Sequence, residues 1–305
     1  MKCIFIYNPN SGKRKIKKNI DYIKERLSEK YDIVDIYETK SKEDFIDKSK
    51  EACDIYDTII FAGGDGSFHN MLQAIMQKPN RPALGYIPAG TVCDIGRNIG
   101  TSKKLKKALD IILKGYTVTY DCGYSNGEYF AYTAATGTFV TMSFMTSGTG
   151  KKYFGAFAYY FNGIKEFFRP TIKTVEFKKN NKIVKINSPL LLVLNSRSIG
   201  GFPINKRIKM NSGKFDIYVL KHSKNRISGA FNVLYFYLLG FLGLKLTSVS
   251  YHLREREFLI KGNDIVWTFD GEEGPRGTID IKYVDNAFNL IINEKKKKRF
   301  GKRAI

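Results

Sequence analysis

Strand-like and helix-like segments alternate through residues 2–114, and this alternation constrains the fold more than any other feature of the chain. The segments with strand character are Lys2–Tyr7, Ile33–Glu38, Thr58–Phe61 and Ala83–Ile87. The segments with the apolar spacing of a helix are Lys13–Lys30, Lys42–Ala52, Asn70–Gln77 and Leu105–Lys114. Strands separated by helices form β-α-β units, so the pattern predicts an α/β domain with a parallel sheet and helices around it.

Beyond residue 116 the pattern changes to strands separated by turn signals such as Ser125-Asn126-Gly127. We expect one of these strands over Val249–Ile260, and long helices only over Phe154–Phe168 and Arg226–Leu242. The chain is therefore expected to have two domains. The first is an α/β domain over residues 1–120, completed by the C-terminal segment 287–305, and the second is a β-sandwich over residues 121–286.

A glycine turn follows the third strand of the first domain. Residues 63–67 are Gly63, Gly64, Asp65, Gly66 and Ser67, directly after an apolar run. Glycines let the backbone approach a ligand closely, and the helix that follows offers free N–H groups that favour phosphate. A tight strand-to-helix connection without a ligand is the alternative. The turn is neither a Walker loop nor a dinucleotide-binding G-x-G-x-x-G motif.

Turn residues also follow the other strands of this sheet. They are Asn8–Gly12, Thr39 and the segment Pro88–Thr91. Ligands of open parallel sheets bind beyond the carboxyl ends of the strands, so we expect these turns and the glycine turn to converge on one site.

The net charge limits the kinds of partner. The chain of 305 residues has 51 Lys and Arg against 29 Asp and Glu, for a formal charge of +22. Such an excess is typical of proteins that bind nucleic acid, an anionic membrane face or phosphorylated ligands, although a lysine-rich proteome explains part of it. The tail over Lys295–Arg303 is the densest basic segment and could attract anionic lipid, or be a solvated tail.

Other sequence features exclude several classes. The four cysteines form no C-x-x-C pair, and with no secretory signal expected at the N-terminus they indicate reduced thiols in the cytosol. Three dispersed histidines are too few for a His-based metal site. The uncharged run Ile227–Leu244 is interrupted by glycines and polar residues, so we expect a core or interface helix there and no membrane span.

Taken together, five motifs resemble those of the diacylglycerol kinase catalytic-domain family, in particular its soluble bacterial lipid kinases. In chain order they are Asn8–Gly12 (N-P-x-S-G), Gly63–Ser67 (G-G-D-G-[ST]), Pro88–Arg97 (P-x-G-T-x-N-D-F-A-R), Asn211–Asp216 (D-D-G-x-[LF]-D) and Asp270–Glu272 (D-G-E). The resemblance covers nearly the whole chain. It implies an ATP-binding domain like those of phosphofructokinases and NAD kinases, a β-sandwich after it, and an active site between the two.

The chain departs from the family pattern at several positions. Cys93 stands where the family has Asn, and Ile95 and Gly96 stand where it has Phe and Ala. After the glycine turn, His69-Asn70 replaces the usual Asn-Glu, and Asn211 replaces the first Asp of the later motif. If these groups orient ATP or magnesium, this member would be slower, more selective or differently regulated.

The resemblance implies a set of ATP contacts in the first domain. They are Asn8, Pro9, Asn10, Ser11, Gly12, Thr39, Gly63, Gly64, Asp65, Gly66, Ser67, His69, Asn70 and Thr91. Asp65 would repel phosphates unless a divalent cation intervened, so we assign it to handling of magnesium-bound ATP, with capping of the following helix as its alternative.

Two carboxylates near the C-terminus are catalytic candidates besides Asp65. Glu272 is the expected general base, which takes the proton of the acceptor alcohol, and Asp270 is its expected partner. The alternative is structural, because Asp-Gly between two strands is also a strong hairpin signal, although a hairpin can present the base as well.

A magnesium ion in the second domain is a further implication of the resemblance. Its ligands would be Asp216 and main-chain carbonyls near Gly213 and Tyr218. One carboxylate with water suffices for Mg²⁺, but a solvated Asp at the start of a strand is the alternative.

The expected function is thus an ATP- and Mg-dependent lipid kinase that converts diacylglycerol to phosphatidic acid. The lipid would be reached from the cytoplasm at an anionic membrane surface, nucleic acid is not an expected partner, and a homodimer is left open. A kinase of another lipid alcohol such as a long-chain base is an alternative, and a non-catalytic basic module for membrane or nucleic acid is another. NAD kinase shares the glycine turn but is disfavoured by Asn8–Gly12 and Asp270–Glu272.

Overall fold

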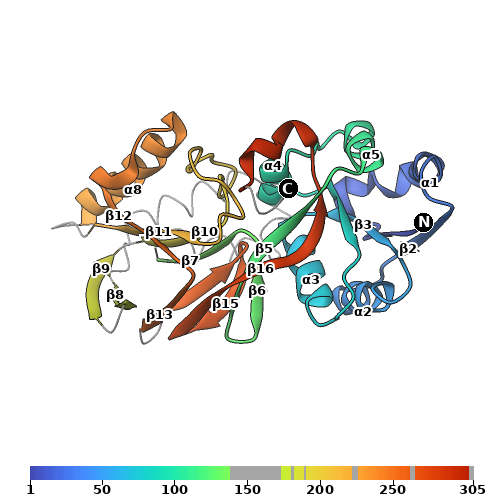
Figure 1. The fold of residues 1–305 in the computed structure, drawn as a ribbon. Helices are drawn as coiled ribbons and strands as arrows, with labels where there is room; N and C mark the ends of the chain where they lie inside the picture. Colours follow the sequence, from blue (N-terminus) through green and yellow to red (C-terminus); the bar gives the residue numbers. More distant parts are fainter. Residues whose placement is uncertain (138–172, 180–181, 189, 222–225, 262–264, 302–305) are drawn as a thin grey trace. The chain divides into compact units, whose positions relative to one another are not determined.

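The computed structural model describes residues 1–137, 173–179, 182–188, 190–221, 226–261 and 265–301. They divide into two compact units (Figure 1). Unit 1 comprises Met1–Cys122, Lys209–Ser212 and the described part of Val284–Ile305, and unit 2 comprises the described parts of Gly123–Ile208 and Gly213–Tyr283.

Unit 1 contains a parallel sheet with the strand order β2-β1-β3-β4. The strands are β2 (Ile33–Glu38), β1 (Lys2–Tyr7), β3 (Thr58–Gly63) and β4 (Ala83–Pro88). The end of β16 (Ile279–Ile291) extends the sheet beside β4, with Leu290 opposite Leu84 in parallel register. All six residues of β3 are buried. A continuous apolar run of this kind is typical of a central strand with helices on both faces.

Five α-helices of unit 1 lie among these strands. They are α1 (Ile20–Ser28), α2 (Lys42–Ala52), α3 (Asp65–Ile75), α4 (Asp94–Ile99) and α5 (Leu105–Lys114). Helices α1 and α5 pack on one face, where Ile23 and Leu109 join the same core as Phe5. On the other face, the ring of Phe61 contacts Phe45 of α2 and Phe68 of α3.

Two helices of unit 1 begin elsewhere than the sequence predicts. The helix expected over Lys13–Lys30 is α1 from Ile20 only, preceded by two 3₁₀ turns, η1 (Ser11–Arg14) and η2 (Lys17–Asn19). Arg14 has a φ of 63°, which no α-helix tolerates, and the basic residues crowded before Ile20 repel one another. The helix expected from Asn70 is α3, which begins at Asp65 directly after the glycine turn.

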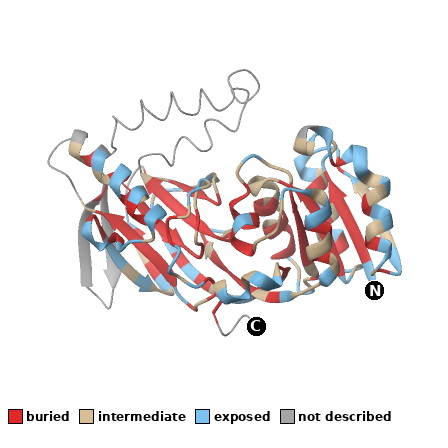
Figure 2. Ribbon diagram, turned by 90° about the horizontal axis from the view of Figure 1, so that it is seen from above, coloured by how far each residue is buried: buried red, intermediate tan, exposed pale blue. Residues whose placement is uncertain are grey.

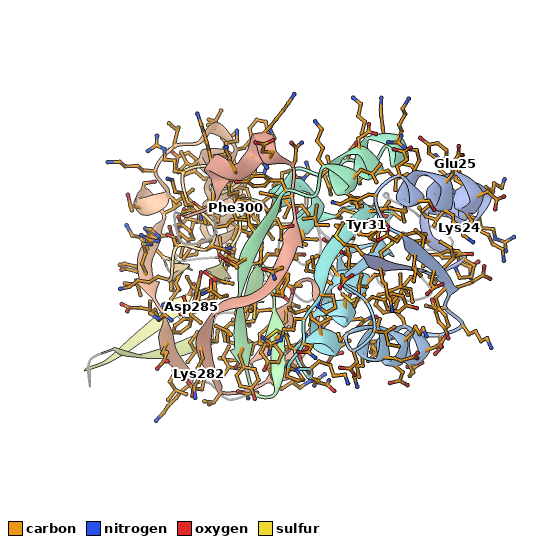
Figure 3. The ribbon with its side chains drawn as sticks, turned by 45° about the vertical axis from the view of Figure 1, so that its right-hand side comes forward. Lys24, Glu25, Tyr31, Lys282, Asp285 and Phe300 are labelled. Atoms are coloured by element: carbon orange, nitrogen blue, oxygen red, sulfur yellow. The ribbon has the colours of Figure 1, made fainter. Side chains whose placement is uncertain are left out.

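The amphipathic character of α1 follows its sequence closely. Lys24 and Glu25 are exposed on its outer side, whereas Tyr31, just beyond the helix, is buried in the core of unit 1 (Figure 3). This helix therefore stabilises unit 1 through one apolar face.

The segment Lys209–Ser212 lies in unit 1, although the sequence places it within the second domain. Met210 forms a parallel bridge with Phe300, which follows the 3₁₀ helix η4 (Glu294–Arg299). The N–H of Met210 donates to Arg299 O at 2.9 Å, and the N–H of Gly301 donates to Met210 O at 2.8 Å. These backbone hydrogen bonds explain why a short segment from the middle of the chain joins the unit that holds the C-terminal residues.

Unit 2 contains two antiparallel sheets. One has the order β12-β11-β10-β7-β14-β15. Its strands are β12 (Ser250–Glu255), β11 (Phe215–Leu220), β10 (Leu190–Leu194), β7 (Thr133–Gly137), β14 (Val266–Phe269) and β15 (Glu272–Arg276). The other contains β13 (Glu257–Lys261) between the start of β16 and β8 (Lys173–Lys179), with β9 (Lys182–Ser188) beside β8. The end of β5 (Thr117–Ser125) pairs with β6 (Glu128–Phe130).

The two sheets of unit 2 enclose one core. Val193 and Ile217 of the first sheet pack in the same cluster as Phe258 and Ile281 of the second, which defines a β-sandwich. The strand expected over Val249–Ile260 is in fact two strands, since the chain passes from β12 in one sheet to β13 in the other at Arg256.

Among the described residues, helix α8 covers the outer face of the first sheet. Helix α8 has the predicted bounds Arg226–Leu242. Successive side chains of β10 point to opposite faces of the sheet. Leu192 lies on the face away from the sandwich core and packs with Val233 and Phe236 of this helix. The other helix expected here, Phe154–Phe168, lies outside the described residues.

Candidate functional site

The glycine turn after β3 is shaped by close contact with the turn after β4. Gly64 precedes α3 in extended conformation, with φ −93° and ψ −168°. A Cβ atom on Gly90 would lie 2.5 Å from the Cα of Gly64, and one on Gly63 would lie 2.2 Å from Ser67 Oγ. These glycines are therefore required by the packing of two turns, whether or not a ligand is bound.

The turn after β1 joins the same group. The N–H of Asn10 donates to Asn8 Oδ1 at 2.8 Å, and the N–H of Ser11 donates to Asn8 O at 2.9 Å. Gly12 has a φ of 59°, and a Cβ there would lie 3.4 Å from the Cβ of Ala89. The turns after β1, β3 and β4 therefore lie side by side, as the strand order predicts.

Asp65 is the first residue of α3, and its side chain contacts another helix. Its Oδ1 atom accepts the N–H of Ile95 at 3.3 Å, in the first turn of α4. Cys93 precedes α4 in left-handed conformation, with a φ of 56°, and is buried. Burial raises the pKa of the Cys93 thiol, so this residue is a neutral packing group beside the turn.

A pocket of about 140 Å³ opens where β1, β2 and β3 end. It is lined by Asn8, Thr39, Ser41, Lys42, Phe45, Ala62, Ser67 and Asn70. Four of these, Asn8, Thr39, Ser67 and Asn70, are residues for which the sequence predicts nucleotide contacts. Pockets that hold a whole drug-sized ligand have roughly 300–1,000 Å³, so this one can hold a part of a nucleotide.

Four pocket residues were not predicted from the sequence as site residues: Ser41, Lys42, Phe45 and Ala62. Ser41 precedes α2 and its Oγ accepts the N–H of Asp44 at 3.1 Å, which places Lys42 in the first turn of the helix beside the pocket. Lys42 supplies a cation and Phe45 an apolar wall. The Ser-x-x-Asp pattern at residues 41–44 marks a helix start, and it was the signal that could have located the first three.

The other predicted nucleotide contacts are in unit 1 but do not line this pocket. They are Pro9, Asn10, Ser11, Gly12, Gly63, Gly64, Asp65, Gly66, His69 and Thr91. Thr91 is exposed, whereas His69 is buried in α3 with its Nε2 atom 3.4 Å from Gln73 Nε2. Burial places His69 among the packing groups of α3.

In unit 2, Asp270 and Gly271 form the hairpin turn between β14 and β15. Both have positive φ, 55° and 88°, and Phe269 faces Glu272 across the hairpin. This matches the hairpin signal of Asp-Gly. The Asp270 carboxylate is buried and accepts the backbone N–H groups of Ala131, Tyr132 and Thr133 at 2.7, 2.9 and 3.1 Å. It therefore holds the turn in place, and the catalytic role expected for it stays a prediction.

Glu272 begins β15 immediately after this turn and is half-buried. Within the described parts of the chain, no hydrogen bond or ion pair engages its side chain. The turn thus separates two carboxylates with different contacts: backbone N–H groups bind Asp270, whereas the Glu272 side chain has no hydrogen bond or ion pair within the described residues.

Asp216 and Tyr218, expected near a magnesium ion, point to one face of β11. Asp216 is buried, and its Oδ1 atom lies 2.7 Å from His252 Nε2 and 3.4 Å from Arg254 Nε. The ring of Tyr218 stacks on His252 with centroids 4.6 Å apart. The Asp216 carboxylate is therefore already in contact with two side chains, those of His252 and Arg254.

Gly213, the third expected ligand, is engaged in the same way, since its carbonyl accepts Arg256 Nη1 at 3.0 Å. With an arginine beside Asp216 and another on Gly213 O, this donor set does not fit Mg²⁺ as it stands. Among the described residues, no group of three or more His, Cys, Asp or Glu side chains could hold a metal ion.

Asn211, which replaces an aspartate of the family motif, has a structural role in unit 1. It has a φ of 54° and is buried. Its Oδ1 atom accepts the N–H of Asp121 at 3.0 Å, while its Nδ2 atom donates to Thr119 O at 2.5 Å. A carboxylate cannot donate the second bond, so the amide suits this position better.

The fold of the chain is shared by proteins of known structure. Solved structures from Bacillus anthracis, one of them of a diacylglycerol kinase, share the fold with TM-scores of 0.82 and 0.76, at 22% and 21% identity, and each covers 96% of this chain. They confirm the predicted fold, an α/β domain with a parallel sheet followed by a β-sandwich. At this level of identity they establish the fold alone.

Sequence comparison identifies the family. The model of the diacylglycerol kinase catalytic domain matches residues 2–125. The diacylglycerol kinase of Staphylococcus carnosus is 31% identical over 218 residues, which cover 71% of each chain, and that of Staphylococcus aureus is 32% identical over 222 residues, with 72% of this chain and 70% of the other. The chain belongs to the diacylglycerol kinase family. It is an enzyme, a kinase, as the motifs predict.

Proposed function

We propose that this enzyme transfers the γ-phosphoryl group of ATP to the hydroxyl of a membrane lipid, diacylglycerol, and forms phosphatidic acid. The observation that carries the proposal is the pocket of unit 1, which collects Asn8, Thr39, Ser67 and Asn70 where three parallel strands end. Beside it, the start of α3 offers N–H groups and the helix dipole to phosphate. The names of the relatives support diacylglycerol as the acceptor.

Magnesium is part of this proposal, and Asp65 is the residue that fits it. One carboxylate at a phosphate-binding turn, together with the nucleotide phosphates and water, is a common way for proteins to bind Mg²⁺. The ion would neutralise charge on the phosphates. Because His252 and Arg254 contact the Asp216 carboxylate, our proposal includes no metal ion in unit 2.

Glu272 is the proposed general base. The lipid hydroxyl oxygen bonds to the γ-phosphorus, the bond between that phosphorus and the β–γ bridging oxygen breaks, and ADP leaves. The hydroxyl proton passes to the Glu272 carboxylate. A positioned base accelerates such a step by about 10²–10⁴-fold. That Glu272 of unit 2 faces the phosphates bound in unit 1 remains a prediction.

Phosphoryl transfer from γ-labelled ATP tests the function directly. The acceptors are dioleoylglycerol in vesicles, a long-chain base in vesicles, and NAD. We expect label in phosphatidic acid, and we expect Glu272→Gln to lower turnover by about 10²–10⁴-fold while ATP still raises the melting temperature. The matched control is Glu273→Gln, which removes the exposed neighbour that pairs with Arg276.

Other outcomes lead to different conclusions. Label in the long-chain base would mean that the substrate is this base and not diacylglycerol. Label in NAD would refute a lipid acceptor. Wild-type turnover in Glu272→Gln would remove this residue from the mechanism. If no acceptor were labelled and ATP did not stabilise the protein, a non-catalytic basic module would be the better description.

The place of action is the cytoplasmic face of an anionic membrane, because the proposed substrate does not leave the bilayer. Within the described residues, no helix has both the length and the apolar character needed to cross a membrane. The basic residues of η4, Lys295 to Arg299, are a candidate for attraction to anionic lipid at about 1 kcal/mol each. Peripheral association is thus the form of membrane contact that we propose.

A further inference from the structure

Helix α8 presents apolar side chains on two opposite faces. Its inner face is fixed by packing within unit 2, where Val233, Phe236 and Leu239 are buried. The ring of Phe236 lies 5.8 Å from that of Tyr218. A Cβ on Gly240 would lie 2.5 Å from Ile204 O, so this side of the helix is in direct contact with backbone. The rotation of α8 about its axis is therefore well defined.

The opposite side carries what we call the outer stripe. It consists of Phe231, Leu234, Tyr235, Leu238, Phe241 and Leu242. The exposed fractions range from 47% at Tyr235 to 64% at Phe231. The spacing of three, four and seven residues places all six on one face of a helix. In the ribbon of Figure 2, coloured by burial, exposed and buried residues alternate along α8.

Isolated exposed apolar residues are common, but a continuous helical stripe of six is not. The only charged residue in the sequence of α8 is Arg226, at its first position. Water would therefore contact several turns of leucine and aromatic side chains with no charge among them. Such a surface is typical of a site that docks on a partner or a membrane.

Basic residues stand at the C-terminal end of the stripe. Lys206 Nζ donates to the carbonyl of Phe241 and lies 5.0 Å from the centre of its ring. Arg207 and Lys245, which follow Lys206 and α8 respectively, are exposed. Three cations therefore lie in or next to the segments that meet at this end of the stripe, on a chain with a formal charge of +22.

We propose that the outer stripe of α8 inserts into the interfacial region of an anionic phospholipid bilayer, with the helix parallel to the membrane. The proposal rests on the proposed function, since a lipid kinase must reach a substrate held in a bilayer. Leucine and aromatic residues on one face, with lysine and arginine beside them, are the composition of interfacial helices. Anionic lipid complements the charge at Lys206, Arg207 and Lys245 better than a second copy of this basic chain does.

Co-sedimentation with vesicles tests the stripe without ATP or turnover. The vesicles contain phosphatidylcholine with or without phosphatidylglycerol. The triple variant Leu234→Gln/Leu238→Gln/Phe241→Gln should bind phosphatidylglycerol vesicles about tenfold or more weakly than the parent. The matched control is Ile33→Gln/Ile55→Gln, which alters apolar residues of similar exposure, 44% and 47%, in unit 1. The control should bind like the parent.

A second measurement detects a new fluorescence signal and so does not depend on a loss of vesicle binding. The sequence has one tryptophan, Trp267, which is buried. Leu238→Trp adds a second indole on the stripe, whose emission should shift to shorter wavelength with phosphatidylglycerol vesicles and be quenched by lipids brominated on their acyl chains. Ile55→Trp is the control, and its emission should not change.

Three results would overturn the proposal. If the triple variant bound vesicles like the parent and sedimented as a smaller species, the stripe would be an interface between copies of this chain. If binding were unchanged but the melting temperature fell by several degrees, the stripe would be covered from within the chain. If Leu238→Trp showed neither shift nor quenching, the stripe would not enter the bilayer. Each result is independent of lipid phosphorylation, so the proposed function could stand or fail separately.

Discussion

The carboxylate of Asp270 accepts the backbone N–H of Tyr132 at 2.9 Å, while the hydroxyl of Tyr132 donates to the carbonyl of Asp270, also at 2.9 Å. This reciprocal pair ties the turn between β14 and β15 to the start of β7. The N–H of Asp270 in turn donates to Thr133 O at 2.9 Å. The turn that precedes Glu272 is therefore fixed by several hydrogen bonds, which is the support that the proposed general base would need.

Asp270→Asn should lower the free energy of unfolding by about 1–3 kcal/mol, because the amide NH₂ would face a buried N–H that now donates to the carboxylate. Asn tolerates the left-handed backbone at this position, so the change isolates the hydrogen bonds. Urea unfolding measures the loss, and Glu273→Gln on the exposed side of the same hairpin is the control. A loss of turnover with unaltered stability would instead make Asp270 a direct participant in catalysis.

The contact between Gly64 and Gly90 gives a paired prediction. A Cβ on Gly90 would lie 2.5 Å from the Cα of Gly64, whereas a Cβ on Gly64 would lie 3.4 Å from the Cα of Gly90, an ordinary contact. Gly90→Ala should therefore destabilise the protein by about 1–3 kcal/mol and reduce the stabilisation by ATP, and Gly64→Ala should cost less.

Thermal unfolding with and without ATP measures both effects. Each variant adds one methyl group to the same pair of turns, so each serves as the control for the other. The opposite result would be that Gly64→Ala lowers the melting temperature or the stabilisation by ATP more than Gly90→Ala does. Glycine would then be required at Gly64 because a ligand approaches it directly, and not because the two turns pack together.

The contacts of Asp216 lead to a prediction about magnesium. Asp216→Asn removes a buried charge next to Arg254 and weakens the bond to His252, and it should lower stability by about 1–3 kcal/mol. The concentration of Mg²⁺ needed for half-maximal turnover should stay unchanged, because the proposal places the ion at Asp65. Titration of turnover with MgCl₂ measures this. A large rise in that Mg²⁺ concentration for Asp216→Asn, but not for His252→Gln, would indicate that Asp216 binds the magnesium ion.

Much of the fold follows from local patterns in the sequence. The predicted bounds of β1, β2, α2, α5 and α8 match the structure, and local signals such as Ser41 before α2 and Gly115 after α5 mark helix ends. The predicted helix over Lys13–Lys30 failed in its first part. The apolar spacing from Ile16 to Leu27 suits a helix, but Arg14 takes a positive φ and the chain forms two 3₁₀ turns before α1 begins.

The site could be predicted less completely than the fold. The Asp-Gly hairpin was visible as a local signal, but the N–H groups that bind Asp270 come from Ala131–Thr133, far away in the sequence. His252 and Arg254, which contact the Asp216 carboxylate, also lie far from it in the sequence, on the neighbouring strand β12. Composition showed that α8 is apolar, but only burial in the structure shows which of its faces unit 2 covers.

The cysteines give a prediction for alkaline pH. All four are free thiols and buried. Burial raises the pKa of Cys3 to about 12 and that of Cys53 to about 11, from an ordinary value of 9.0. The folded protein therefore holds these protons more tightly than the unfolded chain does. The stability that they contribute is fully present below pH 9 and is lost as the pH rises from 9 towards 11 and 12.

Two measurements check this behaviour. At pH 8 the native thiols should react with iodoacetamide far more slowly than they do in denaturant, because the thiolate is the nucleophile and burial suppresses it. Urea midpoints should fall between pH 9 and pH 12, and Cys3→Ala should make that fall shallower. Rapid alkylation of Cys3 in the native protein would contradict its burial, since β1 would then have to open at a rate that a central strand of the sheet does not permit.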